Sequence, residues 1–156
     1  MRAMSNSMDK KKVVVMLSTT FPVGHSKAGE PTEFAQSILD GTKIHTIRAD
    51  KKWLWKKRTD DVNAGKKYVS VREWTGRPYN SEHKKIAAFD HVGLQTITIT
   101  NSSTGAQCWI DEKEVPIYEV AKNDGCSVDD FLEFMFLGSK SNIFEGVVIH
   151  FTDFRY

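Results

Sequence analysis

The sequence predicts an α+β fold in which a small mixed or antiparallel β-sheet curls on itself, with helices at its ends. Three observations lead to this class. Strand-like and helix-like segments are interspersed along the whole chain. The connections between the central strands are short, as they are between antiparallel neighbours. The composition, with 40% hydrophobic and 27% charged residues among 156, is that of one domain with a core of its own.

The N-terminal residues 1–12 are expected to form a flexible tail before a single domain over 13–156. The run Val13–Leu17 is continuous and β-branched, which predicts a strand buried on both faces. This run is shorter than the apolar region of a signal peptide, which needs about seven to fifteen residues. No segment approaches the roughly 18 apolar residues of a membrane span. We therefore expect a cytoplasmic protein with no membrane partner.

Two residues mark the ends of a first helix. Thr32 is expected to be its N-cap, and Gly41 stands where a C-cap glycine belongs. Between them, Phe34 and Ile38 give the helix a short apolar face. A strand over Ile44–Arg48 is expected to follow directly, so the helix and the strand are joined by a tight turn.

A second helix is expected over Lys51–Asn63, and it is the most basic part of the chain. It holds Trp53 and Trp55 among five lysine and arginine residues. Lysines beside aromatic rings can hold a phosphate and stack a base. The alternative is an amphipathic helix with its tryptophans in the core and its lysines in solvent. We prefer this second interpretation, because tryptophans in helices usually pack inward.

The remaining elements are predicted from alternation and from turn residues. The strands are expected over Lys67–Trp74, Ile86–Phe89, Leu94–Thr100, Ala106–Ile110 and Gly146–Phe151. A helix is expected over Val115–Lys122. Another begins at Ser127, whose side chain is expected to cap it while Asp129 and Asp130 occupy its first turn. Gly138 is expected to stop that helix.

Several function classes are disfavoured by what the sequence lacks. The net charge is only +2, so any nucleic-acid contact must come from a local patch. The five histidines show no metal-binding pair, and we expect no metal. No glycine-rich phosphate loop is present, so no nucleotide cofactor is expected. Cys108 and Cys126 are expected to be buried free thiols.

The segment Gly41–Arg48 carries the densest group of polar side chains. Lys43, His45, Thr46 and Arg48 stand around only two isoleucines. This density predicts the wall of a binding cleft, with an ordinary solvated edge strand as the alternative. A lysine partly removed from water can act as a base, and a neighbouring threonine hydroxyl can be activated by it. Residues three apart in a strand face opposite sides, so Lys43 can share a site with Thr46 only from the turn before the strand.

The same segment, preceded by the helix over Phe34–Leu39, resembles the signature of the ASCH domain family, whose members are PUA-like β-barrels. The shared pattern is a helix, Gly-x-Lys, two further residues and Thr-Ile-Arg, then a strand leading to a glycine such as Gly65. The C-terminal part is also similar, with Ala121–Gly125, a helix carrying Asp129, Asp130 and Phe131, and a closing strand. The resemblance covers most of residues 13–156.

The resemblance implies a cleft beside the strand that binds RNA or a modified nucleoside. Some bacterial members are amidohydrolases that remove the acetyl group of N4-acetylcytidine with a lysine, a threonine and a glutamate. On this chain those positions fall on Lys43, Thr46 and Asp124, where the aspartate is one methylene shorter.

Two functions and a third alternative follow from the resemblance. The first is a binding module, with Arg48 and Lys43 on phosphate or carbonyl oxygens and His45 in the cleft wall. In it Trp74 or Tyr79 stacks on a base, while Arg72 and Arg77 extend the positive rim. The second is an amidohydrolase that uses Lys43, Thr46 and Asp124. The third is a scaffold without a ligand. The oligomeric state is left open.

Overall fold

The computed structural model describes residues 10–156 and confirms the α+β class. The strands are β1 (Lys11–Leu17), β2 (His45–Arg48), β3 (Lys67–Trp74), β4 (His83–Phe89), β5 (Gly93–Ser102), β6 (Gly105–Ile110), β7 (Lys113–Glu114) and β8 (Ile143–His150). The helices are α1 (Phe34–Asp40), α2 (Leu54–Asn63), α3 (Ile117–Asn123) and α4 (Val128–Phe136), and a short 3-10 turn, η2 (Lys51–Trp53), precedes α2.

The described strands form two sheets. The order is β1-β3-β4 in the three-stranded sheet and β2-β8-β5-β6-β7 in the five-stranded sheet. Only β1 and β3 run parallel among the paired strands described, so the arrangement is mixed, as predicted. No strand pairing joins the two sheets within residues 10–156, so the pairing does not close a barrel. This leaves β1 and β2 as outer strands, each with an edge open to side-chain contacts.

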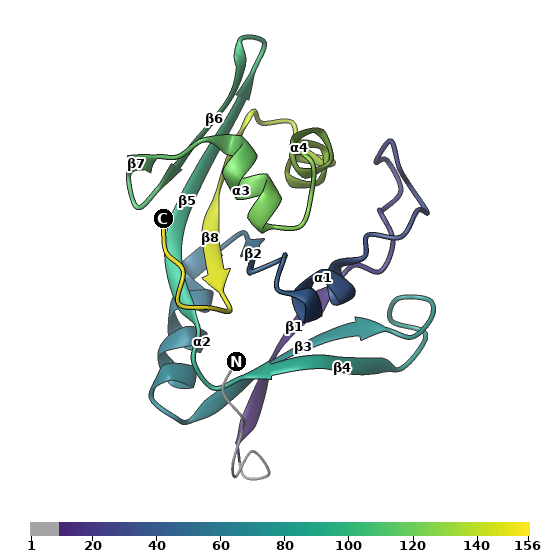
Figure 1. The fold of residues 1–156 in the computed structure, drawn as a ribbon, viewed down its shortest axis with the longest axis vertical. Coiled ribbons are helices and arrows are strands. Elements are labelled where there is room, and N and C mark those ends of the chain that lie inside the picture. The colour runs from purple at the N-terminus through teal and green to yellow at the C-terminus, as the bar shows by residue number, and fades with distance from the viewer. Residues whose placement is uncertain (1–9) are drawn as a thin grey trace.

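Both faces of the C-terminal half of β8 are buried, so this part of the five-stranded sheet lies between two layers of the molecule. Val147 and Ile149 pack with Phe34 and the three-stranded sheet in one core cluster. Val148, which faces the other way, packs with Phe131 of α4 in a second cluster. Figure 1 shows the same arrangement, with α3 and α4 beside the five-stranded sheet and α1 beside the three-stranded one.

Most elements lie close to their predicted positions, and β3 has the predicted bounds. β1 differs in two ways. It begins at Lys11, inside the expected tail, while residues 1–9 lie outside the described part of the chain. Its burial alternates, with Val13, Val15 and Leu17 buried and Val14 and Met16 half-buried. The expectation of burial on both faces was wrong, because an outer strand of this sheet is covered mainly on its core side.

The caps of α1 and α4 confirm two predictions and correct a third. Gly41 ends α1 with a left-handed φ of 79°, and the Ser127 side chain accepts from the backbone N–H of Asp130 at the start of α4. The N-cap of α1 is Glu33 and not Thr32. The Thr32 hydroxyl donates instead to the carbonyl oxygen of Ser18, at 2.5 Å, and so ties the start of α1 to the end of β1.

Candidate functional site

The turn between α1 and β2 places Lys43 in the interior of the protein. The N–H groups of Thr42 and Lys43 both donate to the carbonyl oxygen of Ser37, at 2.9 and 3.0 Å, and so close the last turn of α1. Gly41 permits this reversal because its φ is positive. Lys43 thus precedes β2, as strand periodicity requires if it shares a site with Thr46.

Lys43 forms a buried ion pair with Asp124. The Lys43 side chain is almost fully removed from water, with a residue exposure of 3%. Its Nζ donates to the backbone carbonyl oxygen of Asp124 at 2.7 Å and to the carboxylate Oδ1 of the same residue at 3.1 Å. It also lies 4.6 Å from the centre of the Phe34 ring, a cation–π contact. Burial lowers the pKa of Lys43, although the Asp124 carboxylate acts in the opposite direction.

Asp124 reaches Lys43 from the C-terminal end of α3. It is the C-cap residue of that helix, and Gly125 follows with a φ of 87°. Burial acts to raise the pKa of Asp124, but the Lys43 ammonium and His45 together lower it below its ordinary value. Both side-chain contacts use Oδ1, so within residues 10–156 the second carboxylate oxygen, Oδ2, has no hydrogen-bond partner.

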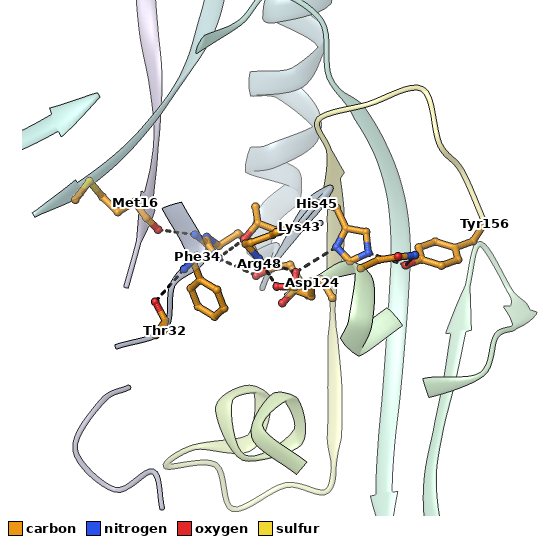
Figure 2. A network of polar contacts seen from close by, with 11 residues as sticks. Met16, Thr32, Phe34, Lys43, His45, Arg48, Asp124 and Tyr156 are labelled. Atoms are coloured by element: carbon orange, nitrogen blue, oxygen red, sulfur yellow. Dashed lines mark hydrogen bonds and ion pairs between the residues drawn. The ribbon is translucent and has the colours of Figure 1, made fainter. Parts of the chain in front are cut away.

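His45 lies on the other side of the Asp124 carboxylate. Its Nδ1 is 3.2 Å from Asp124 Oδ1, and its Nε2 is 2.6 Å from the hydroxyl of Tyr156. The side-chain amide of Asn123 donates to the same hydroxyl at 3.0 Å. Figure 2 shows the resulting row, with His45 between Asp124 and Tyr156. His45 is fully buried, so it supports Asp124 from behind and does not form the cleft wall that the sequence predicted.

Thr46 and Arg48 lie on the face of β2 opposite to His45, and this face is turned toward the three-stranded sheet. Arg48 donates through one guanidinium nitrogen to Thr46 Oγ1 at 2.8 Å, and through the other to the carbonyl oxygen of Met16 at 2.7 Å. Met16 lies in β1, so one arginine bridges the outer strands of the two sheets (Figure 2). Because Thr46 Oγ1 accepts a charge-assisted bond, its own O–H becomes a stronger donor.

These groups converge on one cavity of about 310 Å³. Lys43, Thr46, Arg48 and Asp124 line it, together with Phe34, Cys126, Phe131, Phe134, Met135, Ile47 and β1 with Ser18. We call this cavity the lysine pocket. Its volume is near the lower end for small-molecule sites, and a mostly apolar wall with a few polar groups is typical of such sites. Burial raises the pKa of Cys126 to about 12, so this thiol stays protonated near neutral pH and is a poor nucleophile.

The other predicted ligand residues lie elsewhere. Arg72 donates to the Nδ1 and carbonyl oxygen of His83 in the neighbouring strand β4. The rings of Trp74 and Tyr79 are 5.2 Å apart in the same hairpin, and Arg77 is exposed there. None of the four lines the lysine pocket. The reason is the strand order, since β1 lies between β3 and the pocket.

The sequence reasoning missed three groups that shape the site. Tyr156 holds His45, Phe34 lies against the Lys43 ammonium, and the Met16 carbonyl oxygen receives Arg48. No local sequence pattern indicates that Tyr156 or the backbone carbonyl of Met16 belongs to the site. Phe34 had a weak signal, because it opens the helix that the lysine turn follows.

Within residues 10–156, no helix has the length and apolarity needed to cross a membrane. The same residues contain no group of three or more histidine, cysteine, aspartate or glutamate side chains arranged to hold a metal ion. Comparisons of the chain with protein-family models, curated proteins and solved structures gave no match. The fold and the site together define an α+β protein with a small pocket built around a buried lysine–aspartate pair.

Proposed function

We propose that the protein is an amidohydrolase that acts on a small N-acylated, nucleoside-like molecule in the lysine pocket. The observation that carries this proposal is the convergence of Lys43, Thr46 and Asp124 on one cavity, with the amine nearly fully buried. An amide hydrolase needs a base for water, a donor for the carbonyl oxygen and a proton for the leaving nitrogen. In the pocket, Lys43 can serve first as the base and then as the proton source, and Thr46 can be the donor to the carbonyl oxygen.

Lys43 is the base in this proposal. Burial lowers its pKa, so the neutral amine forms at a lower pH than in a free lysine. The amine takes a proton from water, and the water oxygen bonds to the amide carbon. When the carbon–nitrogen bond breaks, the Lys43 ammonium returns the proton to the leaving nitrogen, giving a carboxylic acid and an amine. Asp124 keeps the Lys43 side chain in place through both steps.

Thr46 is the donor to the carbonyl oxygen as negative charge develops there. Arg48 stands behind it and draws electron density from its oxygen, which favours donation over nucleophilic attack. Among the described residues no hydrogen bond joins Lys43 to Thr46, which agrees with water as the nucleophile. An acyl group found on Thr46 in a quenched reaction would instead make this residue the nucleophile.

The test uses N4-acetylcytidine, the substrate that the ASCH resemblance suggests. The protein should release acetate and cytidine in equal amounts. Lys43→Met should lose this activity and Thr46→Val most of it, while Thr46→Ser should keep a large part. Lys113→Met, which removes an exposed lysine of β7, is the matched control. Equal release by Lys43→Met and the unaltered protein would refute the proposal.

A second candidate is a binding module that holds a nucleoside without reaction. The two contacts from Lys43 to Asp124 favour it, because they stabilise the ammonium and so oppose a role as base. Stoichiometric heat on titration with N4-acetylcytidine, without acetate release above the protein-free background at any pH up to the ordinary lysine pKa of 10.5, would support this candidate. RNA as the ligand of this pocket stays a prediction.

We also propose that the fold is an opened relative of a PUA-like barrel. Support comes from Arg48, which bridges the free edge of β1 to β2 where further strand pairing would close the barrel. Membership of the ASCH family rests on the sequence pattern and stays part of this proposal.

A further inference from the structure

Four exposed lysines and one exposed tryptophan lie together at the start of α2. Lys51, Lys52 and Trp53 belong to the 3-10 turn η2, and Lys56 and Lys57 to the first two turns of α2. All five residues are exposed. We call this group the basic face. It shares no lining residue with the lysine pocket, so its role is independent of the proposed hydrolase function.

The two tryptophans of this segment lie in opposite environments. Trp55 is 8% exposed and packs in the core, with the Arg58 guanidinium 4.7 Å from its ring centre. Trp53 is 66% exposed. The interpretation preferred from the sequence, with both tryptophans in the core, was therefore wrong for Trp53. The exposed indole of Trp53 presents an aromatic face that can stack on a base.

The backbone beneath Trp53 is held in an uncommon conformation. Lys52 and Trp53 are consecutive residues with φ of 64° and 57°, in the left-handed region that side chains rarely adopt. The Asp50 carboxylate accepts from the N–H of Trp55 at 2.9 Å and so fixes the start of α2 just after them. Strained residues of this kind persist where the surroundings impose them, and they cluster at binding sites.

A cavity of about 430 Å³ lies beside Trp53. Two cationic side chains, Lys56 and Arg155, line this cavity. Its wall also includes uncharged polar residues, among them Asn63 and Thr96. Two carboxylates also line it, and both have partners. Asp60 pairs with Lys56 at 3.0 Å. Asp111 accepts from the backbone N–H and hydroxyl of Thr96 and from the Gln95 amide.

We propose that the basic face binds single-stranded nucleic acid. One unpaired base stacks on the Trp53 indole at the mouth of this cavity, and the lysines contact the phosphates on either side of it. The chemistry is complementary, because a single strand offers an exposed aromatic face and a phosphate at each step. A duplex does not offer that face, and the net charge of +2 gives no general field for long duplexes.

The experiment measures the anisotropy of a short fluorescein-labelled oligouridylate titrated with the full chain at a series of salt concentrations. Trp53→Gly removes the ring and suits a positive φ, so it relieves strain and keeps the fold. We expect it to weaken binding by roughly 5- to 150-fold, the effect of losing one stacked base. Trp53→Phe should restore most of the affinity.

A second variant replaces Lys51, Lys52, Lys56 and Lys57 with glutamine. It should flatten the slope of log affinity against log salt by about 0.7 for each phosphate that the variant no longer binds. Its matched control replaces four exposed lysines elsewhere, Lys84, Lys85, Lys113 and Lys140, and should leave the slope nearly unchanged. Circular dichroism of each variant checks the fold.

Three outcomes would overturn the proposal. One is unchanged affinity in Trp53→Gly. Another is an equally weakened affinity in the control quadruple variant, which would mean a general charge effect. The third is equal binding of a duplex, or of phosphatidylserine vesicles through the same residues, which would assign the face to another class of partner.

Discussion

The ammonium nitrogen of Lys43 lies 2.7 Å from the backbone carbonyl oxygen of Asp124 and 3.1 Å from its carboxylate Oδ1. The two residues are 81 positions apart in the sequence, and their contact joins the turn after α1 to the end of α3. Both side chains are nearly removed from water. Each buried charge therefore depends on the other for compensation of its lost hydration.

Breaking this pair from one side should be costly. Lys43→Met leaves the buried Asp124 carboxylate with His45 as its remaining hydrogen-bond partner, and we expect a decrease of about 3–5 kcal/mol in the free energy of unfolding. The double variant Lys43→Met with Asp124→Asn should recover part of that decrease, because no unpaired charge remains. Urea unfolding of both variants measures it. A decrease below about 1 kcal/mol in the single variant would contradict the importance of the pair.

The pair should also make stability depend on acid pH. The pKa of Asp124 is lower in the folded protein than its ordinary value of 3.8. Its contribution to stability is therefore fully present above that value and is lost as the pH falls through the lower, folded pKa. The difference in unfolding free energy between the unaltered protein and Asp124→Asn should shrink over this range. A difference that stays constant down to the lowest measurable pH would count against the pair.

Gly125 lies against the Lys43 side chain, and a larger residue there should disturb the pocket. A Cβ at Gly125 would be 3.4 Å from the Cβ and Cδ of Lys43, which is already van der Waals contact, so a longer side chain there adds atoms beside the lysine. Gly125→Asn should cost about 1–3 kcal/mol by overpacking. Gly29→Asn is the matched control, because Gly29 has a similar φ of 84° and nothing within 4 Å. Equal effects in thermal unfolding would show that only the backbone conformation matters.

Gly146 of β8 permits the close approach of β2. A Cβ there would be 2.3 Å from the backbone oxygen of Arg48, which cannot move without shifting the strand. Gly146→Ala should cost about 1–3 kcal/mol or more and speed amide hydrogen exchange in β2. Gly76→Ala, at an exposed turn where the nearest atom is 3.3 Å away, is the control. Unchanged exchange at Thr46 and Arg48 would be evidence against this constraint.

The Tyr156 hydroxyl should be needed to hold His45. Tyr156→Phe leaves both His45 Nε2 and the Asn123 amide without this partner, at a cost of about 1–3 kcal/mol for groups left unsatisfied. Nitrogen NMR of the His45 ring should show a change in tautomer or in ring exchange. If the ring signals and the stability are the same as in the unaltered protein, Tyr156 does not position His45.

Local patterns in the sequence predicted most of the elements. The alternation of Lys67–Trp74 gave β3 with its bounds, and the glycine at Gly41 gave the end of α1. The period of β2 also predicted that Lys43 must precede the strand if it shares a site with Thr46. These predictions succeed because helix caps, turns and strand faces depend on residues only a few positions apart.

The contacts of the site required the tertiary structure. No local pattern indicates that Tyr156 reaches His45, that Arg48 bridges to Met16, or that β1 separates the Arg72 hairpin from the lysine pocket. The different exposure of Trp53 and Trp55 also could not be read from a local pattern, because the backbone turn at Lys52 and Trp53 decides it. The sequence by itself determined most of the elements and the lysine turn, whereas the packing of distant strands decided which side chains share the pocket.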